Sequence, residues 1–580
     1  MKIEKNRKYS RILYILLFCF ICFDNFLFSQ FIDSKIITLN NYPKNLQLYP
    51  RELNDSAIVR INGNYLPSFD DTLTITVKKE NYLIDEKILY INKNQKYFEY
   101  NINIHSEESN YFFTIESKIF NKTIFKADSI VCGDVFVIMG QSNSHPTNDS
   151  ATIYNSFFRS FGRLTENGNY DYYNVGDTLW GISNAHGFGC RFCGYYMVGV
   201  WGLKLQKLIF DKYKIPTCII NVGTGGSKIE ENLKNEKNPI DLNTIYGKLL
   251  YRTIKSNTKN SIKAIFWFQG EANCDDSYKN YDFCFEKLYQ AWKKDFPNLK
   301  RIYLFQIRPG CDGEHQTELR NIQRNIARKY NEVELISTTG VEYHDGCHYY
   351  LNGYYQLAEQ TFKFVEKDFY NNLINIKTPD VISIKYLNKE LTKIEIVFDQ
   401  KIKLLSKEEL FKIKDYFYTL PFLQYPINIT QEDIRIVLEY KSSNYSTKLV
   451  YLPNKYYNNS NYVYEGPFLK NYDNIGLASF IENIRLFNKD SLITDNNFMV
   501  IYPSISSEFF IIRLNIKNKS SPIISIYDVT GKKIKEYKYY DLDNGVYEFQ
   551  VSIKEFSTGM YYITAKNNSI TSVKKMLFIK

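Results

Sequence analysis

Apolar and polar positions alternate with a period of two along much of residues 30–128. The clearest segments are residues 73–77 and 100–104, where every second side chain is apolar. Such alternation is typical of strands with one buried face, and residues 62–64, Asn-Gly-Asn, are a turn signal between strands. This zone therefore predicts an N-terminal β-sandwich domain.

A different pattern covers residues 129–373, where short apolar runs alternate with segments of helical periodicity. The apolar runs are residues 135–139, 218–222, 264–268, 302–307 and 333–337. Apolar residues at helical spacing are Phe285, Leu288, Trp292 and Phe296, then Leu319, Ile322 and Ile326, then Leu351, Tyr355, Ala358, Phe362 and Val365. Buried strands that alternate with helices predict an α/β domain whose parallel sheet is covered on both faces.

Strand patterns return in the two remaining zones. Residues 374–496 contain alternating segments such as residues 394–398, and residues 497–580 are again strand-rich, with many Lys and Asn residues. The chain therefore predicts an α/β domain flanked by β-sandwich domains on its N-terminal and C-terminal sides.

The first 29 residues have the pattern of a secretory signal peptide. Basic residues precede an apolar run over residues 12–23, and cleavage near Ser29 or Gln30 fits the pattern. The run is short for a membrane span, which needs about 20 apolar residues. A retained anchor is the alternative interpretation.

Charge and cysteine content refine this picture. The formal net charge is +10, but Lys and Arg are spread along the chain, which disfavours nucleic-acid binding. Of 10 cysteines, Cys19 and Cys22 lie in the predicted signal, and the other eight lie between Cys132 and Cys347. Export permits disulfides, but their pairing cannot be predicted from the sequence. Cys190 and Cys193 lack a second pair at zinc-ligand spacing, so a local disulfide or two buried thiols is expected.

Polar or glycine-rich clusters follow four of the apolar runs in the α/β zone. They are residues 140–143 (Gly-Gln-Ser-Asn), 223–227 (Gly-Thr-Gly-Gly-Ser), 269–273 (Gln-Gly-Glu-Ala-Asn) and 345–348 (Asp-Gly-Cys-His). In open parallel sheets, ligands bind outside the carboxyl ends of the strands. We therefore expect the four clusters to meet at one edge of the sheet.

These clusters contain the groups that serine catalysis needs. Ser142 is the candidate nucleophile, and His348 is the candidate base because its pKa range is suited to proton transfer. Asp345, three residues earlier, is expected to hold the imidazole in the required tautomer. The backbone N–H groups of Ser142 and Gly225, with the Gln269 amide, are candidate donors to an oxyanion.

Each cluster also has a simpler interpretation. Residues 140–143 fit a helix N-cap, residues 225–226 a plain turn, residues 269–271 a loop, and Asp345 with His348 a surface pair. Their joint occurrence, in this order at successive strand ends, favours catalysis.

At these residues the chain resembles the sialate O-acetylesterase-like branch of the SGNH hydrolases. The resemblance rests on residues 140–143, 225–227, 267–271 and 345–348, in the family's order. It implies a flavodoxin-like three-layer domain, a triad of Ser142, His348 and Asp345, and an oxyanion hole that includes Gly225 and Gln269. Gln141, Asn143 and Glu271 are expected to bind substrate. No metal or organic cofactor is implied.

Two positions depart from the family pattern. Ser227 stands where the family has Thr, which keeps the hydroxyl, and Ser144 stands where it often has Met, which is expected to alter the pocket wall. Ser142 lacks the Gly-x-Ser-x-Gly elbow of the α/β-hydrolase fold, which argues against that frame.

The C-terminal zone resembles the sorting domain of type IX secretion. The matching residues are Tyr502-Pro503, 526–532, 559–563 and 574–580. The resemblance implies passage through the periplasm and outer membrane by the secretion machinery, to the cell surface or outside the cell. An ordinary sugar-binding or spacer β-domain is the alternative.

Residues 464–468 and 474–480 are similar, more weakly, to the closing β-domain of multidomain esterases.

The sequence therefore predicts a secreted serine esterase that removes O-acetyl groups from carbohydrate through an acyl-enzyme. A non-catalytic surface glycan-binding module is the first alternative, but Ser142, Asp345 and His348 are all present. An esterase acting on peptidoglycan or lipid esters is the second, although no long apolar lid segment is evident.

Overall fold

The protein is described from a computed structural model. The structure describes residues 30–52, 54–148, 150–162, 178–185, 196–311, 313–370, 375–453, 466–485, 498–502, 505–506, 509–553, 555–567 and 570–578. The predicted signal peptide, Cys190, Cys193, Tyr464 and Pro503 lie outside these residues. The chain forms two compact units, one of Met1–Lys385 with Thr392–Ile484 and one of Tyr386–Leu391 with Arg485–Lys580.

The N-terminal region is built from two facing β-layers. One sheet contains β2 (Ile37–Asn41), β4 (Ser56–Tyr65) and β7 (Tyr97–His105). The other layer contains β5 (Asp71–Lys79), β6 (Tyr82–Ile91), β8 (Tyr111–Ser117) and the start of β9 (Lys122–Gly140), which also pairs with β1 (Phe31–Ile32) and β3 (Leu48–Pro50). Alternate residues such as Leu73, Ile75 and Val77 are fully buried between the layers, as the period-two pattern predicts.

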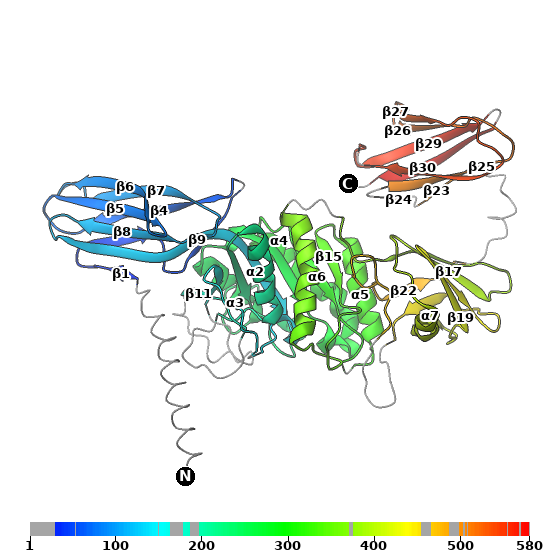
Figure 1. Cartoon of the computed structure of the whole chain (residues 1–580), viewed down its shortest axis with the longest axis horizontal. Coiled ribbons are helices and arrows are strands. Elements are labelled where there is room, and N and C mark those ends of the chain that lie inside the picture. Colours follow the sequence, from blue (N-terminus) through cyan, green and yellow to red (C-terminus); the bar gives the residue numbers. More distant parts are fainter. Residues whose placement is uncertain are drawn as a thin grey trace, which may run out of the picture. The chain divides into compact units, whose positions relative to one another are not determined.

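Strand β9 joins this region to the central domain. Its first half pairs antiparallel with β8, and its second half pairs parallel with the central strands β12 (Thr217–Asn221) and β13 (Ile262–Phe268). Figure 1 shows β9 between the blue N-terminal strands and the central domain. The boundary predicted between residues 128 and 129 therefore falls inside a strand.

A buried carboxylate fixes this junction. Asp134 Oδ1 lies 2.7 Å from Arg51 Nε and 2.6 Å from Lys263 Nζ, and Asp134 Oδ2 accepts a 2.7 Å hydrogen bond from the Tyr370 hydroxyl. Burial acts to raise the pKa of Asp134, but Lys263 and Arg51 outweigh it and hold the pKa below its ordinary value. The ionised carboxylate ties β9 to β13 and to the end of the α/β domain.

The central sheet has mainly parallel strands, as predicted. Its order is β11 (Trp180–Ile182), β10 (Phe158–Phe161), β12, β9, β13, β14 (Arg301–Gln306) and β15 (Val333–Ser337). Every neighbouring pair from β10 to β15 is parallel, and β11 is an antiparallel edge strand. The apolar runs read from the sequence coincide with β9 and β12 to β15.

Helices cover both faces of this sheet. They are α2 (Val200–Tyr213), α3 (Ile245–Lys255), α4 (Tyr281–Asp295), α5 (Gln316–Lys329) and α6 (Leu351–Phe369). Trp201 of α2 packs against Phe266, whereas Trp292 of α4 packs against the next residue, Trp267. Because successive strand residues point to opposite faces, α2 and α4 lie on opposite sides of β13. A mixed α/β protein with parallel strands is thereby confirmed, and the specific flavodoxin-like arrangement stays a prediction.

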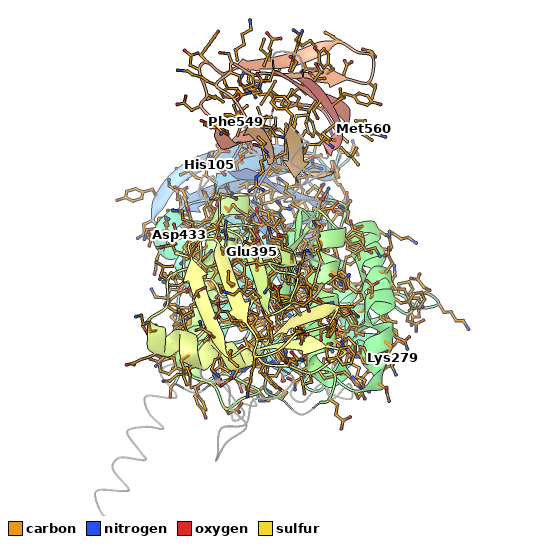
Figure 2. All side chains as sticks on the ribbon, turned by 90° about the vertical axis from the view of Figure 1, so that its right-hand side faces the viewer. His105, Lys279, Glu395, Asp433, Phe549 and Met560 are labelled. Carbon is orange, nitrogen blue, oxygen red and sulfur yellow. A yellow bond between two sulfur atoms is a disulfide. The ribbon has the colours of Figure 1, made fainter. Side chains whose placement is uncertain are left out.

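The third region packs beside α5. One sheet contains β16 (Val381–Tyr386), β17 (Lys393–Phe398), β20 (Arg435–Glu439) and β19 (Asn428–Glu432), and the other contains β18 (Phe417–Leu420), β21 (Lys448–Tyr451) and β22 (Phe480–Asn483). A short helix, α7 (Lys407–Ile413), precedes β18. Figure 2 labels Glu395 on β17 and Asp433 in the β19–β20 turn. The buried Arg324 of α5 forms ion pairs with Asp380 and Glu482, which fix this region to the α/β domain.

The C-terminal unit also has two sheets. One contains β23 (Met499–Tyr502), β25 (Phe509–Ile516) and β28 (Gly545–Ser552), and the other contains β24 (Ile505–Ser506), β30 (Ile570–Phe578), β29 (Gly559–Asn567), β26 (Ile523–Asp528) and β27 (Lys533–Lys538). Phe510, Ile512, Ile524 and Ile563 belong to its own apolar core. Among the helices that the structure describes, none combines the length and apolar content of a membrane span.

Candidate active site

The candidate nucleophile lies where β9 ends. Gly140 has a φ of +136°, and a Cβ there would overlap the carbonyl oxygen of Phe268, so only glycine allows β9 and β13 to approach this closely. The chain then turns into a short 3-10 helix, η1 (Ser142–Ser144). Ser142 Oγ lies 2.8 Å from His348 Nε2, which is hydrogen-bond distance.

The loop that carries His348 is organised by Asp345. The Asp345 carboxylate accepts hydrogen bonds from the backbone N–H groups of Cys347, at 2.8 Å, and of His348, at 2.7 Å. Its Oδ2 lies 3.8 Å from His348 Nδ1, which is an electrostatic contact but not a hydrogen bond. The side chains of His348 and Asp345 are 45% and 47% exposed, so the pair is open to solvent.

Asn143 fixes the turn that follows β9 and carries Ser142, called the nucleophile turn below. It is fully buried, and its Nδ2 donates to Glu271 Oε1 at 2.7 Å and to the Cys347 carbonyl at 3.1 Å. Its Oδ1 accepts from the Tyr354 hydroxyl at 2.8 Å, and its carbonyl accepts from Trp201 Nε1 at 2.9 Å. All these polar contacts are internal, so Asn143 links the nucleophile turn to the His348 loop.

Glu271 is a buried acid beneath the same turn. Burial raises the pKa of its carboxyl above the ordinary value, against the lowering effect of the Asn143 hydrogen bond. Its Oε2 has no hydrogen-bond partner within the described part of the chain. The geometry fits a group that braces Asn143.

Gln141 and Gln269 connect the ends of β9 and β13. Gln141 Oε1 accepts hydrogen bonds from the backbone N–H groups of Gly270 and Ala272, at 3.2 and 3.0 Å. Gln269 Nε2 donates to the Ser227 carbonyl at 3.1 Å and to Asn273 Oδ1 at 2.7 Å. Since an amide nitrogen has two N–H bonds, the Gln269 donors are engaged inside the protein in this conformation.

The glycine cluster after β12 forms an exposed rim. Gly225 and Gly226 are exposed, and no hydrogen bond within the described residues uses their N–H groups or that of Ser142. Beneath the rim, Asn221 Nδ2 donates to the carbonyls of Ser144 and Val198, both at 2.9 Å. The cluster therefore presents unengaged backbone N–H groups above the hydrogen-bonded side chain of Asn221.

Ser144 does not occupy the predicted position in a pocket wall. It is fully buried, and its hydroxyl donates to the Gln141 carbonyl at 2.6 Å. A Cβ at Gly223 would overlap Ser144 Oγ, so the small serine side chain fits under the β12 loop. Its role in the structure is to close the nucleophile turn.

Several supporting residues were missed by the sequence reasoning. Asn221 is the last residue of β12 and could have been found as a polar residue at a strand end, but Trp201 and Tyr354 have ordinary core patterns. His145 was also missed. Its Nε2 lies 3.9 Å from a Cβ built on Gly225, and burial lowers its pKa to about 4. It is thus a neutral neighbour of the rim.

Clusters of metal-ligating side chains were sought among the residues that the structure describes. Within the described ranges, no three His, Cys, Asp or Glu side chains gather in a way that could hold a metal ion.

Two separate parts of the chain match known protein families. Residues 132–366 match the family model "Carbohydrate esterase, sialic acid-specific acetylesterase", and residues 500–580 match the "Secretion system C-terminal sorting domain". A carbohydrate acetylesterase from Xanthomonas citri has a similar fold, with 14% identity and a TM-score of 0.53 over 77% of this chain and 99% of that chain. An Arabidopsis thaliana protein matches at 18% identity over 41% of this chain and 99% of that chain, with a TM-score of 0.33. No curated protein matches the sequence.

The resemblance inferred from the sequence motifs is confirmed by these matches. The sorting domain indicates export through type IX secretion, to the cell surface or the extracellular space, and implies interaction with that machinery. Together, the family match and the sorting domain support a secreted esterase, and the structural likeness shows that its fold is similar to that of a carbohydrate acetylesterase.

Proposed function

We propose that this protein removes O-acetyl groups from carbohydrate, in the manner of a sialate O-acetylesterase, by serine catalysis. The observation that carries the proposal is the 2.8 Å separation of Ser142 Oγ and His348 Nε2 at the carboxyl end of β9. A serine hydroxyl becomes an effective nucleophile when a base lies within hydrogen-bond distance. Gly225 and Gly226 are exposed, so solvent reaches the backbone of this rim.

The proposed reaction has two stages. His348 Nε2 takes the proton of Ser142 as Oγ bonds to the acetyl carbon, and the imidazolium then protonates the departing sugar oxygen. Water next attacks the acetyl-serine while His348 accepts its proton, and the imidazolium returns this proton to Ser142 Oγ as the Ser142–acetyl bond breaks to release acetic acid, which ionises to acetate. Asp345, 3.8 Å from the ring, stabilises the imidazolium electrostatically and holds the loop.

The negative oxygen of each tetrahedral intermediate needs preorganised donors. The N–H groups of Ser142 and Gly225 are the proposed pair, because neither is engaged in a hydrogen bond within the described residues. Gln269, the predicted third donor, has its amide hydrogens on Ser227 and Asn273. This bonding supports a bracing role for Gln269.

Gln269→Ala separates these two roles. Bracing predicts a lower melting temperature, with a loss of about 1–3 kcal/mol in unfolding free energy, because the Ser227 carbonyl and Asn273 lose a buried donor. Calorimetry and kinetics on the same purified variant provide the measurement. A loss of roughly a hundred- to a thousand-fold in kcat with unchanged stability would instead make Gln269 an oxyanion donor.

The C-terminal unit is expected to be dispensable for catalysis. Every proposed catalytic residue lies between Ser142 and His348, within the other compact unit. A chain truncated before Asn497 should keep kcat/KM within about twofold of the full chain, because the catalytic contacts are untouched. In its own host, the truncated protein should accumulate in the periplasm. A folded but inactive truncation would contradict this division of roles.

The substrate class is tested by acetate release from a panel of esters. The proposal expects release from O-acetylated sialic acid and other O-acetylated sugars, and faster cleavage of p-nitrophenyl acetate than of the octanoate ester. Activity confined to long-chain esters would favour a lipid substrate, and activity confined to acetylated peptidoglycan would favour that polymer. Sugar binding without hydrolysis would favour the glycan-binding module.

A further inference from the structure

A disulfide joins the catalytic loop to a neighbouring loop. Cys311, which follows β14, is bonded to Cys347, which lies directly before His348. The other cysteines that the structure describes are free, buried thiols: Cys132, Cys218, Cys274 and Cys284. Within the described residues, the single disulfide therefore lies beside the proposed catalytic base.

The two loops are also in close backbone contact at this point. The Cys311 N–H donates to the Gly346 carbonyl at 3.1 Å. Gly310 has a φ of +151°, and a Cβ there would overlap the Gly346 carbonyl oxygen. The sequence provides glycine on both sides, which lets the disulfide hold the loops together without a steric barrier.

The Cys311 side of the contact is anchored to helix α5. Gln316, the first residue of α5, is fully buried. Its Oε1 accepts from the Gly310 N–H at 3.0 Å, and its Nε2 donates to the carbonyls of Gly310, at 3.1 Å, and Cys311. The disulfide thus connects the catalytic loop to a fixed point on the α/β domain.

The Cys347 side leads directly to the reacting groups. The Cys347 carbonyl accepts the 3.1 Å hydrogen bond from Asn143, the residue after the nucleophile, and the Cys347 N–H is held by Asp345. His348 itself is 45% exposed, so little side-chain packing fixes its ring. The disulfide at Cys347 is a covalent restraint one residue away from the imidazole.

We infer that the Cys311–Cys347 disulfide positions His348 against Ser142, so that the esterase reaches its full turnover only when this bond is formed. The inference rests on the proposed function. It differs from a general stabilising role, which would lower the melting temperature but leave kcat of the folded protein unchanged. A positioning role lowers kcat at temperatures where the protein is fully folded.

Cys311→Ser, Cys347→Ser and the double variant test this inference, with Cys284→Ser on α4 as the matched thiol control. Each is assayed with p-nitrophenyl acetate well below its melting temperature, and circular dichroism confirms the fold. We expect kcat to fall about 10- to 100-fold in all three variants, because a displacement near 1 Å costs this much. KM should change less than about twofold, and Cys284→Ser should match wild type.

Treatment of the wild-type protein with dithiothreitol breaks the same disulfide reversibly, without a substitution. The two thiols of dithiothreitol become a cyclic disulfide as Cys311 and Cys347 gain two electrons and two protons, and mass spectrometry verifies this reduction. Wild-type kcat should then fall to the level of the double variant, recover on removal of the reductant in air, and leave the double variant unaffected.

Two results would overturn the inference. Unchanged kcat in wild type with Cys311 and Cys347 fully reduced would show that the bond does not position His348, and so would wild-type kcat in folded Cys311→Ser. A drop in the double variant's activity on reduction would assign the redox effect to another cysteine pair. If wild type itself released no acetate, the proposed function would fail, which is distinct from equal activity in wild type and variants.

Discussion

Ser142→Ala is expected to lower esterase turnover on the order of a million-fold while the fold stays intact. The substitution removes the oxygen that attacks the acetyl carbon, and loss of a triad nucleophile costs about this much. The side chain is small and its hydroxyl bonds only to His348 among the described residues, so the core is undisturbed. The measurement is acetate release from p-nitrophenyl acetate and from O-acetylated sugars.

Ser150→Ala is the matched control, since Ser150 is exposed and lies eight positions further along the chain. Its activity should equal that of wild type. Retention of more than a tenth of wild-type activity in folded Ser142→Ala would show that another group performs the attack.

His348→Ala should cause a loss of similar size. Without the imidazole, no base lies 2.8 Å from Ser142 Oγ, and the hydroxyl loses its activation. Nucleophile and base act as one unit, so the double variant Ser142→Ala/His348→Ala should be no slower than either single variant. Turnover of all three is measured at one pH with the same ester.

Asp345→Asn tests how much Asp345 contributes to turnover beyond holding the His348 loop. The amide oxygen can still accept from the N–H groups of Cys347 and His348, and the carboxylate does not hydrogen-bond the ring. We therefore expect a smaller loss than for His348→Ala. A loss equal to that of His348→Ala would instead support the predicted hydrogen bond from the His348 ring to Asp345, formed when substrate is present.

The double variant Ser142→Ala/His348→Ala has its own contradicting outcome. If its loss of turnover equalled the product of the two single losses, Ser142 and His348 would not act as a coupled pair.

The parallel strands were predictable because strands buried on both faces are apolar at most positions. The run at residues 333–337 coincides with β15, and the run at 264–268 lies within β13. Motifs that follow such runs meet at one edge of the sheet, which is why Ser142 and His348, 206 positions apart, lie within hydrogen-bond distance.

Other features depend on tertiary geometry that no local pattern encodes. The β9 sequence does not reveal that one strand serves two sheets, because an apolar run looks the same beside either neighbour. The direction of the Gln269 amide and the 3.8 Å gap at Asp345 depend on loop backbone positions. The Cys311–Cys347 pairing likewise depends on a contact between two loops.

The most direct test of the central claim is peptide mass spectrometry after inactivation by a fluorophosphonate, which modifies a serine only when a base activates it. The account predicts one adduct per chain, on Ser142, with activity lost in proportion to labelling, and labelling that is nearly abolished in His348→Ala. Full esterase activity in protein whose Ser142 is completely modified, or an adduct on a different serine that accompanies inactivation, would contradict it.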